Sequence, residues 1–499
     1  MTELAHFINN ARVAGTSGRS QPIFNPATGE TDKTVALAST REVDTVIASA
    51  KAAWPAWSKT PPLRRARILD RFKAILWERA DQLAEAISLE HGKTHDDAVG
   101  EVTRGLEVVE FAGGAPHLLK GEMSEDVGTG VDTNSIRQSI GVVAGITPFN
   151  FPAMVPMWMF PVALACGNTF ILKPSERDPS ASLLMAEWLA EAGLPEGVFS
   201  VVQGDKEAVD ALLNSPDVKG ISFVGSTPIA KYIYETGTKN GKRVQALGGA
   251  KNHMVVMPDA DLDMAANALM GAAYGSAGER CMAISVAVPV TDAVADALIE
   301  KLVPKIEALK VGPAADKGSD MGPVVTEAAM NKIKGLIDQG ETEGAKVVVD
   351  GRGFKAQQGY ENGYFVGPTL LDNVTPDMTV WREEIFGPVL SVVRRKNYNE
   401  AVDLIHSHDY ANGVAVFTRD GDTARSFAHD IEVGMVGINV PIPVPMAFHS
   451  FGGWKLSLFG DHHMHGMEGI RFYTRLKAVT SRWPSGARTD PEFVMPTLG

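Results

Sequence analysis

The sequence has little cysteine, no excess of positive charge and no basic and apolar leader, and each absence excludes a class of protein. Only two cysteines occur in 499 residues, Cys166 and Cys281, so no disulfide framework can form and each thiol needs its own explanation. The 60 acidic residues outnumber the 47 Lys and Arg, and the net charge of −13 argues against a general nucleic-acid or anionic-membrane binder. Because the first residues do not resemble a targeting peptide, we expect a cytoplasmic protein.

One long stretch, residues 138–172, contains no charged side chain. Its length alone would permit a transmembrane helix. It also contains four prolines, each of which removes a helix hydrogen bond: Pro148, Pro152, Pro156 and Pro161. We therefore interpret the stretch as buried core around a site, with no membrane span.

The hydrophobic pattern predicts two α/β domains. From Leu63 to His91 apolar residues recur at helical spacing, which predicts one amphipathic helix that ends at Gly92. Between residues 140 and 250 short apolar runs alternate with helical segments such as Ser180 to Gly193, and this alternation is typical of a parallel sheet covered on both faces. A second alternation runs from about residue 252 to about residue 439.

The segment 120–139 interrupts the first domain. It alternates polar and apolar residues around Gly128 and Gly130, which predicts a protruding hairpin. The unpaired edge of such a hairpin would seek a partner subunit. The stretch FYTRLKAVTSRWP, residues 472–484, is predicted to be a strand with basic edges.

A candidate anion site follows an apolar strand that includes Phe223. A glycine turn leads to Ser226 and Thr227 as candidate N-cap residues and to Pro228 at the first helical position, so free N–H groups would face an anion. The GxGxxG pattern of dinucleotide folds is missing, and an ordinary capped helix remains the alternative.

Lys173, Glu176 and Arg177 follow another buried strand. A carboxylate at a strand's carboxyl end can accept hydrogen bonds from ribose hydroxyls. A solvated loop would have the same composition, so this segment by itself leaves both interpretations open.

Cys281 is the candidate nucleophile. It lies in GSAGERCMAIS, where the adjacent Arg280 is predicted to favour the thiolate, the nucleophilic form of cysteine. Many single cysteines are inert core residues, and Cys166, inside the apolar run, fits that description better.

Five motifs together resemble the aldehyde dehydrogenase superfamily, in its order and approximate spacing: TPFNFP (147–152), KPSE (173–176), FVGST (223–227), GERC (278–281) and EEIFGP (383–388). The resemblance implies a Rossmann-type NAD domain, residues 1–119 and 140–247, and an α/β catalytic domain, residues 248–470. It also implies a small β oligomerisation element, residues 120–139 and 471–499. The last strand would cross to the hairpin of another subunit, giving homodimers and then a tetramer.

The resemblance also implies the roles of individual residues. Cys281 would be the nucleophile, and the Asn150 amide would donate to the oxyanion formed when Cys281 attacks an aldehyde. Ser226 would hold the NAD pyrophosphate and Glu384 the nicotinamide ribose. The full set of implied cofactor residues is Thr147, Phe149, Lys173, Glu176, Arg177, Gly225, Ser226, Gly248, Glu384 and Phe386. Lys173 and Glu176 would hold the adenine-side ribose, and the charge of Glu176 favours NAD over NADP.

The acceptor of the acyl group separates this chain from hydrolytic relatives. Where those enzymes carry Glu-Leu-Gly-Gly-Lys, this chain has Ala246 in place of the water-activating glutamate. Losing a general base costs about 10²–10⁴ in rate. Glu279 is an alternative base, or an acceptor that stabilises its loop. The segments ALGGAKNH and GSAGERCM resemble the coenzyme-A-acylating methylmalonate-semialdehyde dehydrogenases, which implies coenzyme A as cosubstrate and propionyl-CoA or acetyl-CoA plus carbon dioxide as products.

A semialdehyde that carries a carboxylate needs cations in its site. Arg280 adjoins the nucleophile, and Arg104 lies on a helix-like segment that resembles the subfamily's arginine-bearing helix. The alternative for Arg104 is a solvated ion pair with Glu101 or Glu107. We expect decarboxylation to follow hydride transfer, because only then is the carboxylate β to a thioester carbonyl that can accept the electrons.

Other functions remain open at this stage. The run Asp461 to His465 has three histidines, but no second segment supplies ligands, and we expect no functional metal. A hydrolytic dehydrogenase of another acidic semialdehyde and a catalytically silent structural oligomer are the alternatives. The sequence does not locate the coenzyme A site, separate malonate from methylmalonate semialdehyde, or choose among valine, pyrimidine and inositol breakdown.

Overall fold

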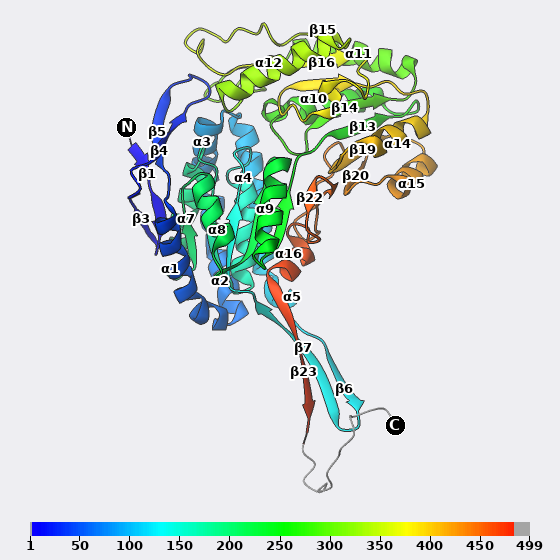
Figure 1. Ribbon diagram of the computed structural model, residues 1–499. Coiled ribbons are helices and arrows are strands. Elements are labelled where there is room, and N and C mark those ends of the chain that lie inside the picture. Colours follow the sequence, from blue (N-terminus) through cyan, green and yellow to red (C-terminus); the bar gives the residue numbers. More distant parts are fainter. Residues whose placement is uncertain (1, 484–499) are drawn as a thin grey trace.

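The computed structural model describes residues 2–483 and consists of two α/β units with a narrow arm that projects from the first unit (Figure 1). The predicted fold class is therefore confirmed. No helix within residues 2–483 is long and apolar enough to cross a membrane. The uncharged stretch instead supplies buried strands and a buried helix of the first unit.

The first unit is built on an eight-stranded sheet whose five central strands are parallel. From β8 the chain proceeds outward to β9 and β10 and then returns to the other side of β8 to form β11 and β12. In open α/β sheets the carboxyl ends of the strands beside such a reversal form a ligand crevice. In sheet order the strands are β22 (Leu458–Phe459), β12 (Arg243–Leu247), β11 (Val218–Val224), β8 (Val142–Ile146), β9 (Thr169–Lys173), β10 (Phe199–Val201), β2 (His6–Ile8) and β3 (Ala11–Val13).

Strand β22 comes from a late part of the chain that the sequence assigns to the other unit. It pairs antiparallel with β12, with Ala246 opposite Phe459. This pairing covers an edge of β12 that would otherwise expose unpaired backbone groups. The chain thus returns to the first unit before it enters the arm.

Helices cover both faces of the first sheet, and those against its strands are α1 (Thr40–Lys59), α6 (Met154–Ala165), α7 (Ser180–Glu191), α8 (Lys206–Asn214) and α9 (Thr227–Lys239). Packed on α6, on α7 and on one another are α2 (Pro62–Glu78), α3 (Ala80–His91), α4 (His95–Gly113), α5 (Ala115–Leu118) and α16 (Gly466–Phe472). The prediction of one helix from Leu63 to His91 is wrong, because Arg79 leaves helical geometry and serves both as C-cap of α2 and as N-cap of α3. The predicted end at Gly92 is confirmed, with φ of 93° in the left-handed region.

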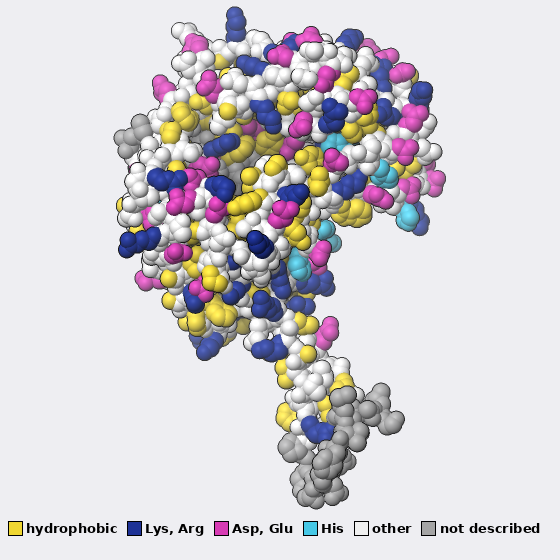
Figure 2. Space-filling view, in the orientation of Figure 1, with side chains coloured by type: hydrophobic (Ala, Val, Ile, Leu, Met, Phe, Trp, Pro, Cys, Tyr) yellow, Lys and Arg dark blue, Asp and Glu magenta, His cyan; other side chains and the backbone are white. Residues whose placement is uncertain are grey.

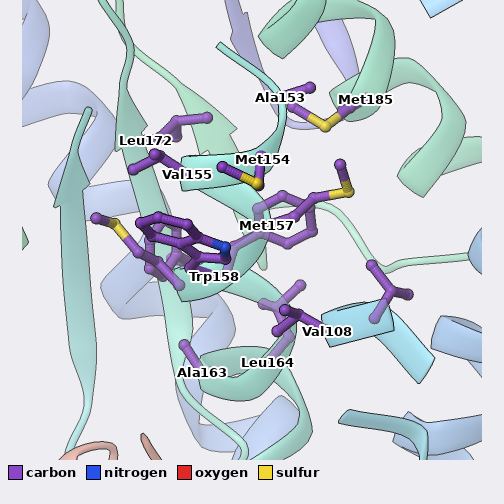
Figure 3. Close-up of a cluster of buried hydrophobic side chains, with 14 of the residues drawn as sticks. Val108, Ala153, Met154, Val155, Met157, Trp158, Ala163, Leu164, Leu172 and Met185 are labelled. Atoms are coloured by element: carbon purple, nitrogen blue, oxygen red, sulfur yellow. The ribbon is translucent and has the colours of Figure 1, made fainter. Parts of the chain in front are cut away.

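Helix α6 is the centre of the largest core cluster. Every one of its residues is buried, and its side chains lie among residues of α4, β9 and α7 (Figure 3). Because α6 is apolar all round, its position is set by packing on every side. It holds the loop that precedes it, which carries Asn150, against the core.

The second unit is built on a seven-stranded sheet: β15 (Lys346–Val349), β16 (Thr369–Asp372), β17 (Val389–Val392), β14 (Ile284–Pro289), β13 (Asn252–Val256), β19 (Gly413–Phe417) and β20 (Met435–Ile438). All neighbours are parallel except β15 and β16. Its helices are α10 (Leu262–Tyr274), the short 3₁₀ helix η1 (Gly275–Gly278), α11 (Asp292–Glu307), α12 (Glu327–Thr342), α13 (Thr379–Arg382), α14 (Tyr398–Ser407) and α15 (Gly421–Asp430).

The arm is a three-stranded antiparallel sheet in the order β23 (Thr474–Arg482), β7 (Val131–Ser139) and β6 (Met123–Gly128) (Figure 1). The predicted hairpin is confirmed. The expectation that the last strand crosses to another subunit is wrong, since β23 pairs with β7 of its own chain over nine residues, from Thr474 opposite Ser139 to Arg482 opposite Val131. Residues 484–499 of the expected oligomerisation element lie outside the described residues.

Two small sheets complete the fold. One contains β1 (Thr2–Leu4), β5 (Thr31–Ala36) and β4 (Ser20–Phe24), and the other contains β18 (Tyr410–Ala411) and β21 (Trp454–Lys455).

Candidate active site

The carboxyl ends of four adjacent parallel strands bring together residues that lie far apart in the sequence. Thr147 follows β8, Lys173 ends β9, Gly225 and Ser226 follow β11, and Gly248 follows β12. These strands are neighbours in the sheet, on both sides of the chain reversal. The predicted cofactor residues therefore share the crevice where doubly wound sheets bind nucleotides.

Helix α9 begins directly at this edge. Ser226 is its N-cap, with extended backbone and no hydrogen bond from its side chain to the helix, and a proline lies in the first turn. A side chain at Gly248 would place Cβ 2.7 Å from the Leu456 carbonyl oxygen, so the backbone there approaches without room for one. A free hydroxyl and free N–H groups at a helix start suit a phosphate.

Lys173 and Glu176 form an ion pair of 3.1 Å at the end of β9. Although burial raises it, the pKa of Glu176 lies below its ordinary value, because Lys173, a backbone N–H and Arg177 stabilise the charge. Glu176 is therefore an ionised carboxylate that can accept hydrogen bonds from hydroxyl groups. Nearby, the buried hydroxyl of Thr147 has no hydrogen-bond partner among the described residues.

Aromatic and charged groups lie on the other side of the crevice. The rings of Phe149 and Phe386 meet edge to face at 5.9 Å, and the Arg177 guanidinium lies 5.0 Å from the Phe149 ring. Phe386 has φ of 56°, a strained value for a bulky residue and typical of functional sites. The Glu384 carboxylate accepts from Ala250 N at 3.1 Å, and burial raises the pKa of Glu384 to about 7.

The nucleophile loop is a tight turn between α10 and β14. Three successive residues, Ser276, Ala277 and Gly278, have φ of 52°, 52° and 72°. Two amide side chains hold the main chain of the cysteine itself, since Asn252 Nδ2 and Asn412 Nδ2 donate to the Cys281 carbonyl oxygen at 3.0 and 3.2 Å. The second unit thus fixes Cys281 by its backbone, and the hydrogen-bond donors to its sulfur within residues 2–483 are backbone N–H groups of its own loop.

Arg280 acts on Cys281 with the predicted sign, because its charge lowers the pKa of the thiol, but burial outweighs it. Burial, with the added charge of Glu384, raises the pKa of the Cys281 thiol to about 12. Arg280 and two backbone N–H groups lower it by less. Without a bound ligand, Cys281 is therefore mainly a thiol.

Cys281 lines a cavity of about 270 Å³ that lies between the two units. Its wall is partly apolar, with side chains such as Phe151, Trp158 and Ile442, and both predicted arginines, Arg104 and Arg280, line it. The carboxylates at its wall are Asp96, Asp97, Glu101 and Glu107. The cavity is near the lower end of the size range of small-molecule sites and has their mixed lining.

The two arginines are not equally available. Arg104 donates to Glu107 at 2.7 Å, to Met446 sulfur at 3.3 Å, and to the carbonyl oxygens of Val444 and Pro445 at 3.3 and 2.9 Å. Arg280 is paired with Asp97 and reaches the Gly271 carbonyl oxygen only at 3.5 Å. Arg104 thus fixes the loop that closes the cavity, whereas Arg280 keeps more donors for a ligand.

Asn150 is buried in the turn between β8 and α6 and is not part of the cavity wall. Its side-chain amide has no protein hydrogen-bond partner within residues 2–483. Its carbonyl oxygen accepts from Lys93 Nζ at 2.6 Å. The amide is therefore uncommitted, while the main chain that carries it is anchored.

Neither Ala246, at the position of the usual general base, nor Glu279, its possible substitute, lines the cavity. Ala246 is fully buried in β12, with no ionisable group at that position. Glu279 is fully buried, accepts from Val325 N at 3.2 and 3.3 Å, and is not part of the cavity wall. Burial raises the pKa of Glu279 to about 8. The structure favours the second interpretation of Glu279, an acceptor that stabilises its loop.

The remaining candidates from the sequence lie outside this site. Cys166 is buried, and burial raises the pKa of its thiol to about 12. In the tail, His462 hydrogen-bonds Glu468 at 3.0 Å. Within residues 2–483 no group of three or more His, Cys, Asp or Glu side chains is arranged to hold a metal ion.

Sequence reasoning missed one organising element, the face of α4 that is turned to the cavity. Asp97 accepts from Ser276 N at 2.9 Å and pairs with Arg280, and Glu101 pairs with Lys93 at 2.8 Å. With Arg104, these residues are spaced by four and three, which places them on one face of a helix. That spacing was visible in the sequence, but their partners, far away along the chain, were not.

Comparison with known proteins identifies the family that this geometry represents. The model of the aldehyde dehydrogenase family matches residues 13–479. The chain belongs to the aldehyde dehydrogenase family. Malonate-semialdehyde dehydrogenase of Pseudomonas aeruginosa is 62% identical over the full length of both chains.

Two solved structures of family members have nearly the same fold. A candidate methylmalonate-semialdehyde dehydrogenase from Sinorhizobium meliloti 1021, in complex with NAD, is 62% identical with a TM-score of 0.97, over 98% of this chain and 99% of that one. Methylmalonate-semialdehyde dehydrogenase from Oceanimonas doudoroffii is 59% identical with a TM-score of 0.96, over 97% and 99%.

Proposed function

We propose that this aldehyde dehydrogenase catalyses the NAD-dependent, coenzyme-A-acylating oxidation of malonate and methylmalonate semialdehydes, with loss of carbon dioxide. The observation that carries the proposal is Cys281 in a small cavity with Arg280, where the position of the usual water-activating glutamate is Ala246. The names of the full-length relatives support the same substrate class.

The crevice of the first sheet fits NAD. Glu176 is ionised, Thr147 has an unpartnered buried hydroxyl, and the start of α9 is open to a phosphate. We assign Ser226 and Gly225 to the pyrophosphate, Lys173 and Glu176 to the adenine-side ribose, and Glu384 to the nicotinamide ribose. We place Gly248, Arg177, Phe149 and Phe386 around the same ligand. When bound, NAD accepts the hydride.

Cys281 would perform the covalent chemistry. Its sulfur attacks the aldehyde carbon, and the carbonyl oxygen becomes an oxyanion to which the free amide of Asn150 donates. Hydride leaves that carbon readily only because the adjacent oxygen carries negative charge. Loss of the hydride gives a thioester on Cys281. Since the free thiol has a raised pKa, deprotonation has to accompany ligand binding or attack.

The carboxylates around the thioester decide whether water or another thiol accepts its acyl group. Three of those at the cavity wall are already bound: Asp97 to Arg280, Glu101 to Lys93, and Glu107 to Arg104. Such ion pairs have little tendency to accept a proton from water. We therefore assign acyl transfer to the thiol of coenzyme A. A thiol ionises far more readily than water, so this acceptor does not need the water-activating glutamate that Ala246 replaces.

Decarboxylation is placed after oxidation. Before hydride transfer the carbon next to the carboxylate has no thioester that could accept the electrons of the breaking bond. Afterwards the thioester carbonyl accepts them, carbon dioxide leaves, and a proton replaces it. We assign Arg280, with Arg104 behind it, to orienting the carboxylate. Carbon dioxide released in the absence of NAD would contradict this order.

Two other functions make different predictions. A hydrolytic dehydrogenase would release a free acid without coenzyme A, and Asp96 is the cavity carboxylate with no ion pair within residues 2–483 that such a reaction would need to recruit. A structural oligomer without activity would be indifferent to alkylation of Cys281. The uncommitted amide of Asn150 and the open sulfur favour catalysis.

The two units and the arm have separate roles in the proposed enzyme. We assign NAD binding to the unit with residues 1–119 and 140–247, joined by β22, and catalysis to residues 248–470. We propose that the arm, residues 120–139 and 471–499, pairs with other subunits to form a tetramer, because its described part exposes apolar side chains (Figure 2). Met123 and Leu476 are among these exposed residues. With two cysteines and a net charge of −13, we place the enzyme in the cytoplasm, in a pathway such as valine breakdown.

The experiment that tests the proposal is product analysis. Purified protein is incubated with methylmalonate or malonate semialdehyde and NAD, with and without coenzyme A. We expect propionyl-CoA or acetyl-CoA, carbon dioxide and NADH in the complete mixture. A free acid formed equally fast in both mixtures would select the hydrolytic function, and no NADH in either would refute both.

A further inference from the structure

A buried ion pair lies directly behind the turn that carries Asn150. Lys93, after α3, and Glu101, on α4, are paired at 2.8 Å, and both side chains are fully inaccessible to solvent. A buried pair is a poor source of stability, because removing both charges from water costs about as much as their attraction returns. Its presence therefore requires another explanation.

Each partner of the pair holds one end of the turn. Lys93 Nζ donates to the Asn150 carbonyl oxygen at 2.6 Å, and its charge lies 4.4 Å from the centre of the Phe151 ring. Glu101 Oε1 accepts from Ala153 N at 2.8 Å and from Met154 N at 3.1 Å. The pair thus spans the whole segment from Asn150 to the first residue of α6.

This segment has few other anchors. Within residues 2–483 the main-chain N–H groups of Phe149, Asn150 and Phe151 donate to no protein acceptor. The N-cap of α6, Ala153, has no side chain that could satisfy the helix start, and Glu101 takes that role from another helix. The Asn150 amide makes no hydrogen bond within the described part of the chain, so its direction depends on the main chain that Lys93 holds.

We propose that Lys93 and Glu101 are positioning residues that fix the main chain of Asn150 and so aim its amide at the oxyanion formed on Cys281, an inference that rests on the function proposed above. They act through Asn150: Lys93 does not line the cavity, and Glu101 lines it with a side chain that is inaccessible to solvent. A displacement of about 1 Å in a group that must meet a developing charge can cost about 10²-fold in rate. The rate should therefore fall although the site keeps all its reacting groups.

The test compares two reactions of Cys281 that need no NAD or coenzyme A. Acylation by p-nitrophenyl acetate passes through a tetrahedral oxyanion: sulfur bonds to the carbonyl carbon, and nitrophenolate then leaves. Alkylation by iodoacetamide forms a carbon–sulfur bond with loss of iodide and passes through no oxyanion. The ratio of the two rates reports the oxyanion site alone, while any change in sulfur access or pKa moves both rates.

We expect K93M and E101Q to slow acylation by about 10-fold to 10²-fold and to leave alkylation unchanged. N150A should do the same, and K93M/N150A should be no slower than N150A. The matched control is K242M, which removes another buried lysine that donates to the carbonyl oxygens of Ser215 and Val218, far from the cavity. It should change neither rate. E101Q keeps an acceptor for the α6 N–H groups, so it is the variant to use if K93M does not fold.

Three results would overturn the inference: equal slowing of both reactions, no slowing of acylation, or a further loss when K93M is added to N150A. The last would mean that Lys93 acts on the fold in general. Failure of the proposed function can be told apart from failure of this inference. In that case the wild-type protein would form no NADH from the semialdehydes, whatever the rates of the two cysteine reactions.

Discussion

Replacing Arg280 with methionine should remove selectivity for acidic aldehydes while leaving the chemistry of Cys281 in place. Arg280 lines the cavity beside the nucleophile and commits its guanidinium to Asp97 and, weakly, to Gly271. It therefore keeps N–H donors for a substrate carboxylate. Propanal is the matched neutral substrate, because a methyl group replaces the carboxylate of malonate semialdehyde.

The size of the effect follows from the hydrogen bonds that are lost. A charge-assisted hydrogen bond contributes about 1.5–3 kcal/mol, and a tenfold change in rate corresponds to about 1.4 kcal/mol. R280M should therefore lower kcat/KM for malonate semialdehyde by about 10-fold to 10²-fold. R280M also leaves the Asp97 carboxylate unpaired at the cavity wall, where it would repel the substrate. The double variant D97N/R280M removes that repulsion and measures the arginine alone.

The assay is NADH formation at saturating NAD and coenzyme A with each aldehyde in turn. The ratio of kcat/KM for malonate semialdehyde to that for propanal should fall in both variants. R104M is expected to lower kcat/KM for both aldehydes, because Arg104 fixes the loop that contains Val444 and Pro445. An unchanged ratio in D97N/R280M would refute the assignment of Arg280 to the carboxylate.

Three further predictions follow from the charges in the site. Because the pKa of Cys281 is raised to about 12, the alkylation rate in the absence of NAD should rise steadily between about pH 7 and about pH 10; a plateau above about pH 8 would contradict the buried thiol. Because the pKa of Glu384 is raised to about 7, its carboxylate is charged only above that pH. NAD affinity, measured by tryptophan fluorescence, should therefore weaken as the pH falls through this value, and a dependence that persists in E384Q would exclude Glu384. Because Glu176 is ionised, E176Q should raise kcat/KM for NADP relative to NAD by about tenfold or more; an unchanged preference would mean that other residues exclude the 2′-phosphate.

The sequence was sufficient for features that depend on local pattern. The alternation of apolar runs predicted two parallel sheets, and the motifs at the ends of β8, β9, β11 and β12 predicted which residues meet at one edge. The cap at Ser226 and the stop at Gly92 were also predictable, because both depend on a few neighbouring residues. In each of these cases the controlling interaction spans only a few residues of chain.

Features that depend on distant partners were not predictable from one sequence. The net pKa of Cys281 is raised although Arg280 lowers it, because burial and the charge of Glu384, which is distant in the sequence, outweigh the neighbouring arginine. The break at Arg79 interrupts a continuous helical pattern, which periodicity cannot detect. The pairing of β23 with its own hairpin depends on where the last strand leaves the first unit.

The most direct measurement is a single-turnover reaction in the absence of coenzyme A. Protein is mixed with malonate semialdehyde and excess NAD, NADH is followed by absorbance, and the state of Cys281 is read by intact-protein mass spectrometry. We expect one rapid equivalent of NADH per site, a lasting acetyl thioester on Cys281, and further NADH only after coenzyme A is added. Continuous NADH production with an unmodified Cys281 and a free acid as product would show that water takes the acyl group after all.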